Sequence, residues 1–291
     1  MTIKDIYINS SGKKIHAIKS GNGDIPLHFL HANGLCAGTY IPFIDLFSEK
    51  FNTVATDIPG HGDSDHHGEK TILHWDIFID HIKESIIRNC DTPVVGVGHS
   101  LGAVVTYITA ARYPELFSKL VLIDPVIFPK RKLIIIALAK KLGLLSKINP
   151  LSTGARRRKK IFASREEAYT RFSAGKGMFK TWTDDFIKAY TFNGLKEEND
   201  SAVALKCNPE TEAQIYESIL MDIWSYPKKI QSPTLLIRGG KTDTFDKYAA
   251  RRLVKEIKDC RLITIEDAGH FVPMEKAALC QKTIQNFVLE K

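Results

Sequence analysis

The feature that most constrains this chain is a repeated alternation between short apolar segments and longer helix-like segments. Each short segment is rich in β-branched residues and apolar throughout, as expected of a strand covered on both faces. Strands separated by helices pair in parallel as βαβ units. We therefore expect an α/β fold with an eight-stranded, mostly parallel sheet, its strands near residues 5–10, 14–18, 25–31, 51–57, 93–98, 119–124, 233–240 and 261–267.

Helical patterns separate these strands, near residues 40–49, 73–90, 101–112, 246–258 and 274–290. The alternation stops after Asp124 and resumes about a hundred residues later, at Pro233. Between them the pattern predicts amphipathic helices and no strand. We therefore expect a core of residues 1–126 and 227–291, with residues 127–226 inserted after the sixth strand as a helical cap.

One stretch of this cap, LIIIALAKKLGLL at residues 133–145, is apolar on most sides. Such a pattern predicts a lid helix buried over the site, and an interfacial helix is the alternative. The cap is also rich in aromatic residues. Most of them should pack the cap, and a few should favour an acyl chain or an aromatic ring in the pocket.

The charge of the chain limits the classes of partner that it is expected to bind. The formal net charge is +8, and the basic residues cluster at 130–132 and 156–160. Such runs are typical of solvated faces, with an anionic substrate or a membrane surface as a second interpretation. Nothing beyond the charge indicates nucleic-acid binding. The oligomeric state stays open.

The five cysteines are scattered and odd in number, which predicts reduced thiols in the cytoplasm. The first residues show no signal-peptide pattern, and no stretch is long and apolar enough for a membrane span. We therefore expect no stable membrane insertion.

A nucleophile is indicated by Gly98-His99-Ser100-Leu101-Gly102, which follows an apolar strand and precedes a run of small residues. This G-x-S-x-G pattern predicts a tight strand-to-helix turn that lifts the serine hydroxyl clear of the sheet. Small residues must flank the serine because a larger side chain would collide with adjacent backbone. The turn also aims the first amides of the new helix at the reacting centre.

A serine hydroxyl is a weak nucleophile, so it needs a base, and the base needs an orienting acid. His270, after the last predicted strand, is the candidate base. Asp243, just beyond the strand at 233–240, is the preferred acid. Asp124, at the end of the strand after the nucleophile, is the alternative, and Asp246 is a third candidate that better suits a helix N-cap.

These motifs resemble the α/β-hydrolase superfamily, in its serine-nucleophile, esterase- or lipase-like branch with a helical cap after the sixth strand. The likeness covers nearly the whole core. It is carried by HANG (31–34), DIPGHGDSD (57–65), GHSLG (98–102), LIDP (122–125), RGGKTD (238–243) and GHFVPMEK (269–276).

The chemistry calls for an oxyanion hole, and the amide of Leu101, directly after the nucleophile, should be one donor. The resemblance implies the amide of Asn33 as the second. Ala32 stands where many relatives have glycine, and its methyl group restricts the backbone. His31 should brace this loop by hydrogen bonding.

The sequence thus predicts a serine hydrolase that cleaves a small-molecule carboxylic ester through an acyl-enzyme, with no cofactor. Hydrolysis of a carbon–carbon bond in a keto acid by the same triad is the alternative. A non-catalytic ligand receptor on a hydrolase scaffold is the alternative from another class. The His- and Asp-rich stretch at 61–67 looks like a metal site, but its match to a structural turn of the superfamily explains it, so no metal is expected.

Overall fold

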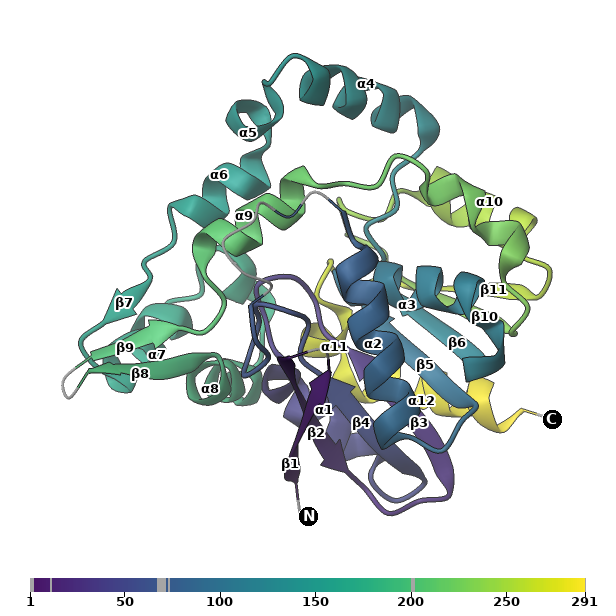
Figure 1. Cartoon of the computed structure of the whole chain (residues 1–291), viewed down its shortest axis with the longest axis horizontal. Helices are drawn as coiled ribbons and strands as arrows, with labels where there is room; N and C mark the ends of the chain where they lie inside the picture. The colour runs from purple at the N-terminus through teal and green to yellow at the C-terminus, as the bar shows by residue number, and fades with distance from the viewer. Residues whose placement is uncertain (1–2, 11, 67–71, 73, 200–201, 291) are drawn as a thin grey trace.

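The computed structural model describes residues 3–10, 12–66, 72, 74–199 and 202–290. It contains the expected eight-stranded sheet, with strand order β1-β2-β4-β3-β5-β6-β10-β11 (Figure 1). β2 pairs antiparallel with β1 and with β4, and the remaining pairings of this sheet are parallel. The strands are β1 (Lys4–Ser10), β2 (Lys13–Ser20), β3 (Ile25–Leu30), β4 (Phe51–Thr56), β5 (Val94–His99), β6 (Phe117–Ile123), β10 (Thr234–Gly239) and β11 (Cys260–Ile265).

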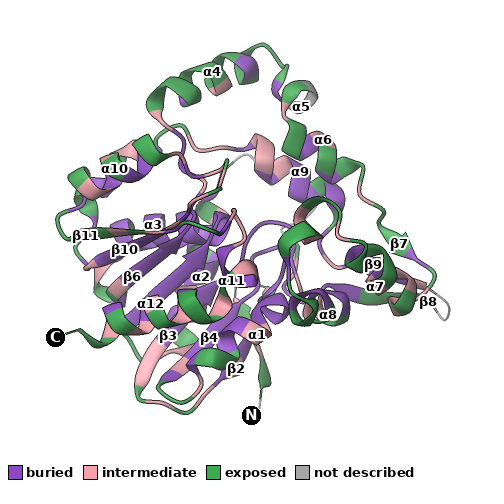
Figure 2. Ribbon diagram, turned by 180° about the vertical axis from the view of Figure 1, so that it is seen from behind, coloured by how far each residue is buried: buried purple, intermediate pink, exposed green. Residues whose placement is uncertain are grey.

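Successive residues of the central strands pack into two cores, one on each face of the sheet. In β6, Leu120 and Leu122 join one core, and Val121 and Ile123 join the other. Because both faces are covered, the strands are apolar throughout, and they form the buried layer in Figure 2. The covering helices include α2 (Asp76–Asn89), α3 (Leu101–Arg112) and α10 (Lys247–Glu256) on the Leu120 side, and α1 (Ile41–Ile44) and α12 (Ala277–Leu289) on the Val121 side.

The expected core helices form, with two revisions. The segment near 40–49 consists of short turns, η1 (Ala37–Tyr40), α1 and η2 (Asp45–Phe47), instead of one helix. The last helical segment is divided into α11 (Val272–Glu275) and α12, because Lys276 adopts an extended φ of −141°. A further short turn, η3 (Pro114–Leu116), precedes β6.

The segment between β6 and β10 is mostly helical, as expected, but the prediction that it contains no strand is wrong. Three short strands form a second, antiparallel sheet in the order β7-β9-β8. Strands of two to five residues are too short to give an alternation signal in the sequence. The division of the chain at residues 126 and 227 stays a prediction. The cap elements are α4 (Lys130–Lys141), α5 (Leu145–Ile148), α6 (Pro150–Arg156), β7 (Ile161–Phe162), α7 (Arg165–Ser173), η4 (Gly177–Thr181), α8 (Asp184–Asn193), β8 (Leu195–Asn199), β9 (Ala202–Leu205), α9 (Pro209–Glu217), η5 (Ile223–Ser225) and η6 (Pro227–Lys229).

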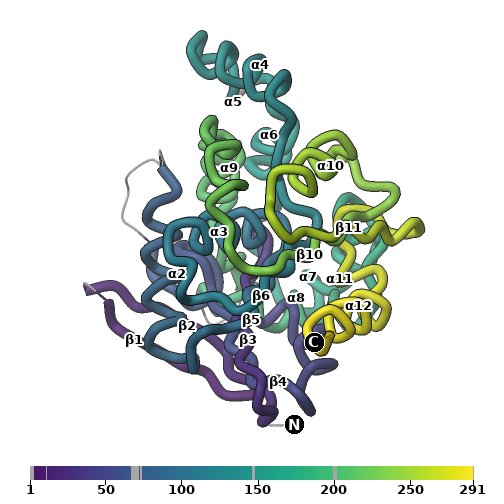
Figure 3. The backbone as a smooth tube through the Cα atoms, turned by 90° about the vertical axis from the view of Figure 1, so that its right-hand side faces the viewer, coloured from purple at the N-terminus to yellow at the C-terminus, as the bar shows by residue number. Residues whose placement is uncertain are grey.

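The prediction that residues 133–145 form a buried lid helix is also wrong. Helix α4 lies at the end of the molecule farthest from the sheet, and only Leu133 and Ala139 of its residues are buried (Figures 1 and 3). Ile134 is 70% exposed and Leu138 is 58% exposed. Among the described residues, no helix has both the length and the apolar character needed to cross a bilayer.

The second basic run, at 156–160, is not a free solvated face. Arg156 pairs with Glu210 and Glu217 of α9, and Arg158 pairs with Glu212 of the same helix. The Arg158 guanidinium also donates to the Tyr190 hydroxyl of α8. These contacts join α6, α8 and α9, so much of the charge of this run is neutralised inside the cap.

Three buried histidines affect how the stability of the fold depends on pH. Burial lowers the pKa of His28 in β3 and of His61 to about 3, and it holds the pKa of His99, at the end of β5, well below its ordinary value. These imidazoles are therefore neutral in the folded chain near pH 5, whereas in the unfolded chain they take up protons near pH 6.5. Because the unfolded chain binds more protons between pH 6.5 and 3, the folded state loses stability as the pH falls through that window.

We expect these three histidines together to lower the free energy of unfolding by up to about 4 kcal/mol per pH unit below pH 6, since each contributes up to about 1.4 kcal/mol per unit. Glutamine at position 28 can still hydrogen-bond the Thr56 hydroxyl, which lies 2.9 Å from His28 Nε2. His28→Gln should therefore lower the slope by roughly one third. Urea unfolding of both proteins at pH 6 and pH 5 measures this slope, and an equal slope in the variant would show that His28 is not responsible.

Candidate active site

Ser100 stands at the turn between β5 and α3, with a φ of 57° and a ψ of −114°. This is a sparsely populated backbone conformation for a residue with a side chain. A Cβ added to Gly98 would lie 2.5 Å from the backbone of Gly102, and one added to Gly102 would lie 2.2 Å from the Leu30 carbonyl oxygen. The turn therefore has the elbow geometry, and the need for small flanking residues, that the motif predicts.

The Ser100 hydroxyl is connected to a histidine and a carboxylate. Its Oγ lies 3.0 Å from His270 Nε2, and His270 Nδ1 lies 2.7 Å from Asp124 Oδ2. Because a carboxylate accepts hydrogen bonds, Nδ1 carries the proton, and Nε2 is free to accept the proton of the hydroxyl. This arrangement can convert Ser100 into a nucleophile.

Asp124 is held firmly at the end of β6. It is fully buried, and its backbone adopts a φ of 42°. Its Oδ1 accepts from the Gly239 amide at 3.0 Å, and its Oδ2 accepts from the Thr242 hydroxyl at 2.6 Å as well as from His270. Three donors from two other segments thus fix the carboxylate under the imidazole.

The prediction that Asp243 contacts His270 is wrong. Asp243 is exposed, and its carboxylate accepts from the Thr244 hydroxyl at 3.2 Å. Asp246 acts as the N-cap of α10, accepting from the Tyr248 amide at 2.7 Å. β6 and β10 are adjacent parallel strands that end at the same edge of the sheet, so either could supply the acid, and the structure brings Asp124 to the imidazole.

The loop that carries His270 is fixed from both sides. The Glu275 carboxylate accepts from the amides that flank the histidine, at 2.8 Å from Gly269 and 3.2 Å from Phe271. The His270 carbonyl accepts from His99 Nε2 at 2.9 Å. The position of the base is therefore set by its main chain as well as by its side chain.

His99 in turn connects this loop to the loop after β3. The Tyr40 hydroxyl donates to His99 Nδ1 at 2.6 Å and accepts from the Ala32 amide at 3.2 Å. Since burial keeps His99 neutral, its two nitrogens can play these opposite roles. One chain of hydrogen bonds thus joins the candidate oxyanion loop, the elbow and the loop of the base.

Of the two expected oxyanion donors, Leu101 follows Ser100 directly in the chain, and Asn33 lines the same cavity as Ser100. Leu101 is the first residue of α3, where helix amides have no partner within the helix. The amides on either side of Asn33 are engaged, that of Ala32 by Tyr40 and that of Gly34 by His61 Nε2 at 3.1 Å. The Asn33 amide lies between them and remains the candidate second donor.

The loop after β3 has the expected brace. His31 Nδ1 donates to the Ala32 carbonyl at 2.8 Å, and His31 Nε2 accepts from the Ile58 amide at 2.9 Å. Ala32 is buried and does not adopt a positive φ. The residue of this loop with a positive φ is Gly34, at 76°.

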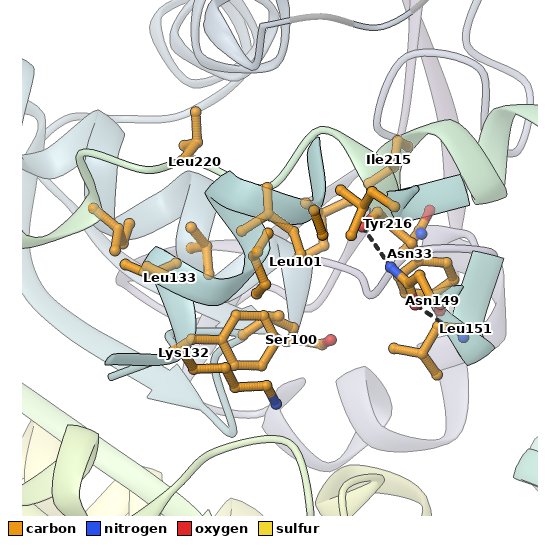
Figure 4. A pocket seen from close by; sticks show the side chains of 18 of the residues that line it. Asn33, Ser100, Leu101, Lys132, Leu133, Asn149, Leu151, Ile215, Tyr216 and Leu220 are labelled. Carbon is orange, nitrogen blue, oxygen red and sulfur yellow. Dashed lines mark hydrogen bonds between the residues drawn. The ribbon is translucent and has the colours of Figure 1, made fainter. Parts of the chain in front are cut away.

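A largely apolar cavity of about 270 Å³ opens beside the serine. Figure 4 shows the Ser100 hydroxyl between Lys132 and Leu133 of α4 on one side and Asn33, Asn149 and Leu151 on the other. Lys132 is the one charged side chain among the described residues that line it. The other lining residues are Trp75, Leu101, Val104, Val126, Phe128, Ile135, Ile136, Ala139, Leu145, Ile148, Pro150, Ile215, Tyr216, Ile219, Leu220 and Ile223.

In the described part of the chain, one cluster outside this site could in principle hold a metal ion, namely His16, Asp57 and Asp63. Protein groups satisfy it: Asp57 Oδ2 lies 2.6 Å from His16 Nδ1, Asp57 Oδ1 accepts from the Ala37 amide, and Asp63 pairs with Lys206. This agrees with a structural turn. His67, at the end of the His- and Asp-rich stretch, lies outside the described residues.

Sequence reasoning missed three residues that position the site, namely Thr242, Tyr40 and Glu275. The sequence did contain a signal for Glu275, because this residue lies in the GHFVPMEK motif that carries the resemblance. Thr242 precedes the aspartate that looked like the acid, and Tyr40 lies far along the chain from its partner His99. Neither position has a spacing that indicates its contact.

The comparisons with known proteins agree with this fold. Residues 29–280 match the sequence pattern of the alpha/beta hydrolase family, so the chain belongs to that family. The thioesterase domain from the curacin biosynthetic pathway superposes with a TM-score of 0.77, at 18% identity over 98% of this chain and 100% of that one.

Two curated relatives are named for succinate derivatives. The 2-(acetamidomethylene)succinate hydrolase of Mesorhizobium japonicum is 24% identical over 270 residues, 93% of this chain and 90% of that protein. The (E)-2-((N-methylformamido)methylene)succinate hydrolase of Acinetobacter baylyi is 30% identical over 121 residues, 40% of this chain and 43% of that protein. The match to the second thus spans less than half of its length.

The geometry predicts that Asp124, and not Asp243, supports the reactivity of Ser100. Asp124→Asn should slow labelling of Ser100 by a fluorophosphonate probe by about 10³-fold or more, because an amide no longer enforces the reactive tautomer of His270. Asp243→Asn is the matched control and should label at the rate of the unmodified chain. If Asp243→Asn instead labelled more slowly than Asp124→Asn, and both variants had the circular dichroism of the unmodified chain, the role of the orienting acid would belong to Asp243.

Proposed function

We propose that this chain is a serine hydrolase that forms an acyl-enzyme on Ser100. The observation that supports it is the hydrogen-bonded series from Ser100 Oγ through His270 to Asp124 at the mouth of an apolar cavity. The family itself indicates a hydrolase.

In the first step, His270 Nε2 takes the hydroxyl proton while Oγ bonds to the carbonyl carbon of the substrate. The carbonyl electrons move to the oxygen, and the amides of Leu101 and Asn33 are the proposed donors that stabilise the negative charge there. The protonated His270 then gives its proton to the leaving group as the bond to it breaks. Asp124 stabilises the imidazolium throughout.

In the second step, water replaces the leaving group. His270 takes a proton from the water while the water oxygen attacks the acyl carbon. The second oxyanion then collapses, the bond between the acyl carbon and Oγ breaks to release the acid, and His270 returns the proton to Oγ to restore the Ser100 hydroxyl. Every proton transfer of this cycle passes through His270 Nε2, which contacts the Ser100 hydroxyl, and the cycle uses no cofactor.

The cavity favours a substrate with an apolar acyl group, and a carboxylic ester is the first candidate. Its walls are formed by side chains such as Val104, Leu133, Ile215 and Leu220. A buried methylene contributes about 0.8 kcal/mol, or roughly a fourfold gain in affinity for each added carbon.

The alternative function is hydrolysis of a carbon–carbon bond in a keto acid by the same triad. The names of the two relatives, both hydrolases of acid-bearing succinate derivatives, favour this alternative over a simple ester. Lys132 is the described side chain of the cavity wall that could pair with such a carboxylate. Under this alternative, Lys132→Gln should lower turnover of a keto acid or of an acid-bearing enamide and leave turnover of a neutral ester unchanged. A non-catalytic receptor would instead leave Ser100 unreactive toward the fluorophosphonate probe.

A series of p-nitrophenyl esters tests the ester proposal. We expect kcat/KM to rise about fourfold per methylene until the cavity is filled, and Ser100→Ala to abolish turnover. Leu220→Trp should narrow the cavity and remove the preference for long chains, whereas Leu279→Trp, at an exposed position of α12, should not. Turnover that does not depend on chain length would show that the cavity is not the acyl site.

A further inference from the structure

Exposed apolar side chains are concentrated on the tip of the cap, which we define as residues 130–151. Seven of the 18 large exposed apolar side chains among the described residues lie there, on a segment that stands clear of the rest of the molecule (Figure 3). They are Ile134, Ile135, Leu138, Leu142, Leu144, Ile148 and Leu151. Contiguous exposed apolar surface of this kind marks a binding surface.

Helix α4 presents apolar residues in two directions. Leu133, Ile136 and Ala139 line the cavity, whereas Ile134 and Leu138, one helical turn apart, face away from it. A helix that serves only as a lid has no need for the second set. The outer face is therefore available to a partner outside the chain.

The charge of the tip indicates the kind of partner. The tip, residues 130–151, contains six lysines and arginines and no aspartate or glutamate. Unlike the run at 156–160, the basic side chains Lys130, Arg131, Lys140 and Lys141 have no carboxylate partner among the described residues. An apolar face flanked by unpaired cations is typical of an element that lies on an anionic membrane surface.

The same apolar surface continues into the site. Ile135, Ile148 and Leu151 are 66%, 59% and 52% exposed, and all three also line the cavity that reaches Ser100. An acyl chain could thus pass from the surface of the tip to the serine along a lining that is mostly apolar. A second copy of the chain is a poor occupant, because it would bring the same cations against each other.

We propose that the tip of the cap docks onto a bilayer containing anionic phospholipid, and that the cavity receives the acyl chain of an ester from that bilayer. The docking stands independently of the chemistry, whereas the delivery of the acyl chain rests on the proposed function. The segment would lie on the bilayer without spanning it.

Vesicle co-sedimentation of the full chain carrying Ser100→Ala tests the docking without turnover. We expect binding to vesicles of phosphatidylcholine with about 30% phosphatidylserine, much weaker binding to phosphatidylcholine alone, and a loss of binding at high salt. Ile134→Glu with Leu138→Glu should lower the affinity at least tenfold. The matched control, Ile87→Glu with Leu279→Glu, changes two apolar residues of core helices that are 50% and 51% exposed, and it should bind normally.

Lys140→Gln with Lys141→Gln should weaken binding to the anionic vesicles by roughly fivefold per lysine. Equal binding by the tip and control variants, or no binding to anionic vesicles, would overturn the docking. So would a dimer in sedimentation velocity without vesicles that the tip substitutions dissociate, because a second copy would then cover the face.

Assays of ester hydrolysis test the docking and the proposed function separately. With Ser100 restored, the tip substitutions Ile134→Glu and Leu138→Glu should slow turnover of a long-chain ester embedded in anionic vesicles at least tenfold, and leave turnover of dissolved p-nitrophenyl acetate unchanged. An equal loss on both substrates would overturn the delivery of acyl chains by docking. Normal vesicle binding without hydrolysis of any ester would retain the docking and reject the proposed ester hydrolysis.

Discussion

The hydrogen bond between His270 Nδ1 and Asp124 Oδ2 is the contact on which the site depends, because it joins the loop after β11 to the end of β6 across the intervening strand β10. β10 contributes to this junction, since the Gly239 amide donates to Asp124. On the other side, Ser100 follows β5, the neighbour of β6. Four adjacent strands thus bring Ser100 and Asp124 each to within hydrogen-bonding distance of His270.

Main-chain contacts stabilise the same arrangement. Glu275 holds the amides around His270, and His99 holds its carbonyl. Through Tyr40, His99 also reaches the loop that carries Asn33. The candidate catalytic groups and the loop of the candidate oxyanion donor therefore belong to one hydrogen-bonded network, and preorganised groups of this kind are what electrostatic stabilisation requires.

The cap has two parts with different electrostatics. Near α9, the run at 156–160 is paired with glutamates, which joins helices α6 and α8 to α9. At the tip, the cations of α4 have no such partners among the described residues, and the apolar residues between them face solvent. The part of the cap near α9 is thus held together by its own ion pairs. The tip exposes cations and apolar side chains to solvent, and other residues of the tip line the cavity.

The sequence by itself determined the eight strands of the sheet, the elbow at Ser100 and the candidate base His270, because these depend on local patterns: apolar runs, a glycine pair around a serine, and a histidine directly after a strand. Only the tertiary structure decided between Asp124 and Asp243. Both follow adjacent parallel strands at one sheet edge, and which carboxylate turns inward depends on the left-handed backbone at Asp124 and on the hydroxyl of Thr242. The exposure of α4 was likewise decided in three dimensions, because an apolar helix has the same sequence whether a protein core, a cavity or a lipid surface lies against it.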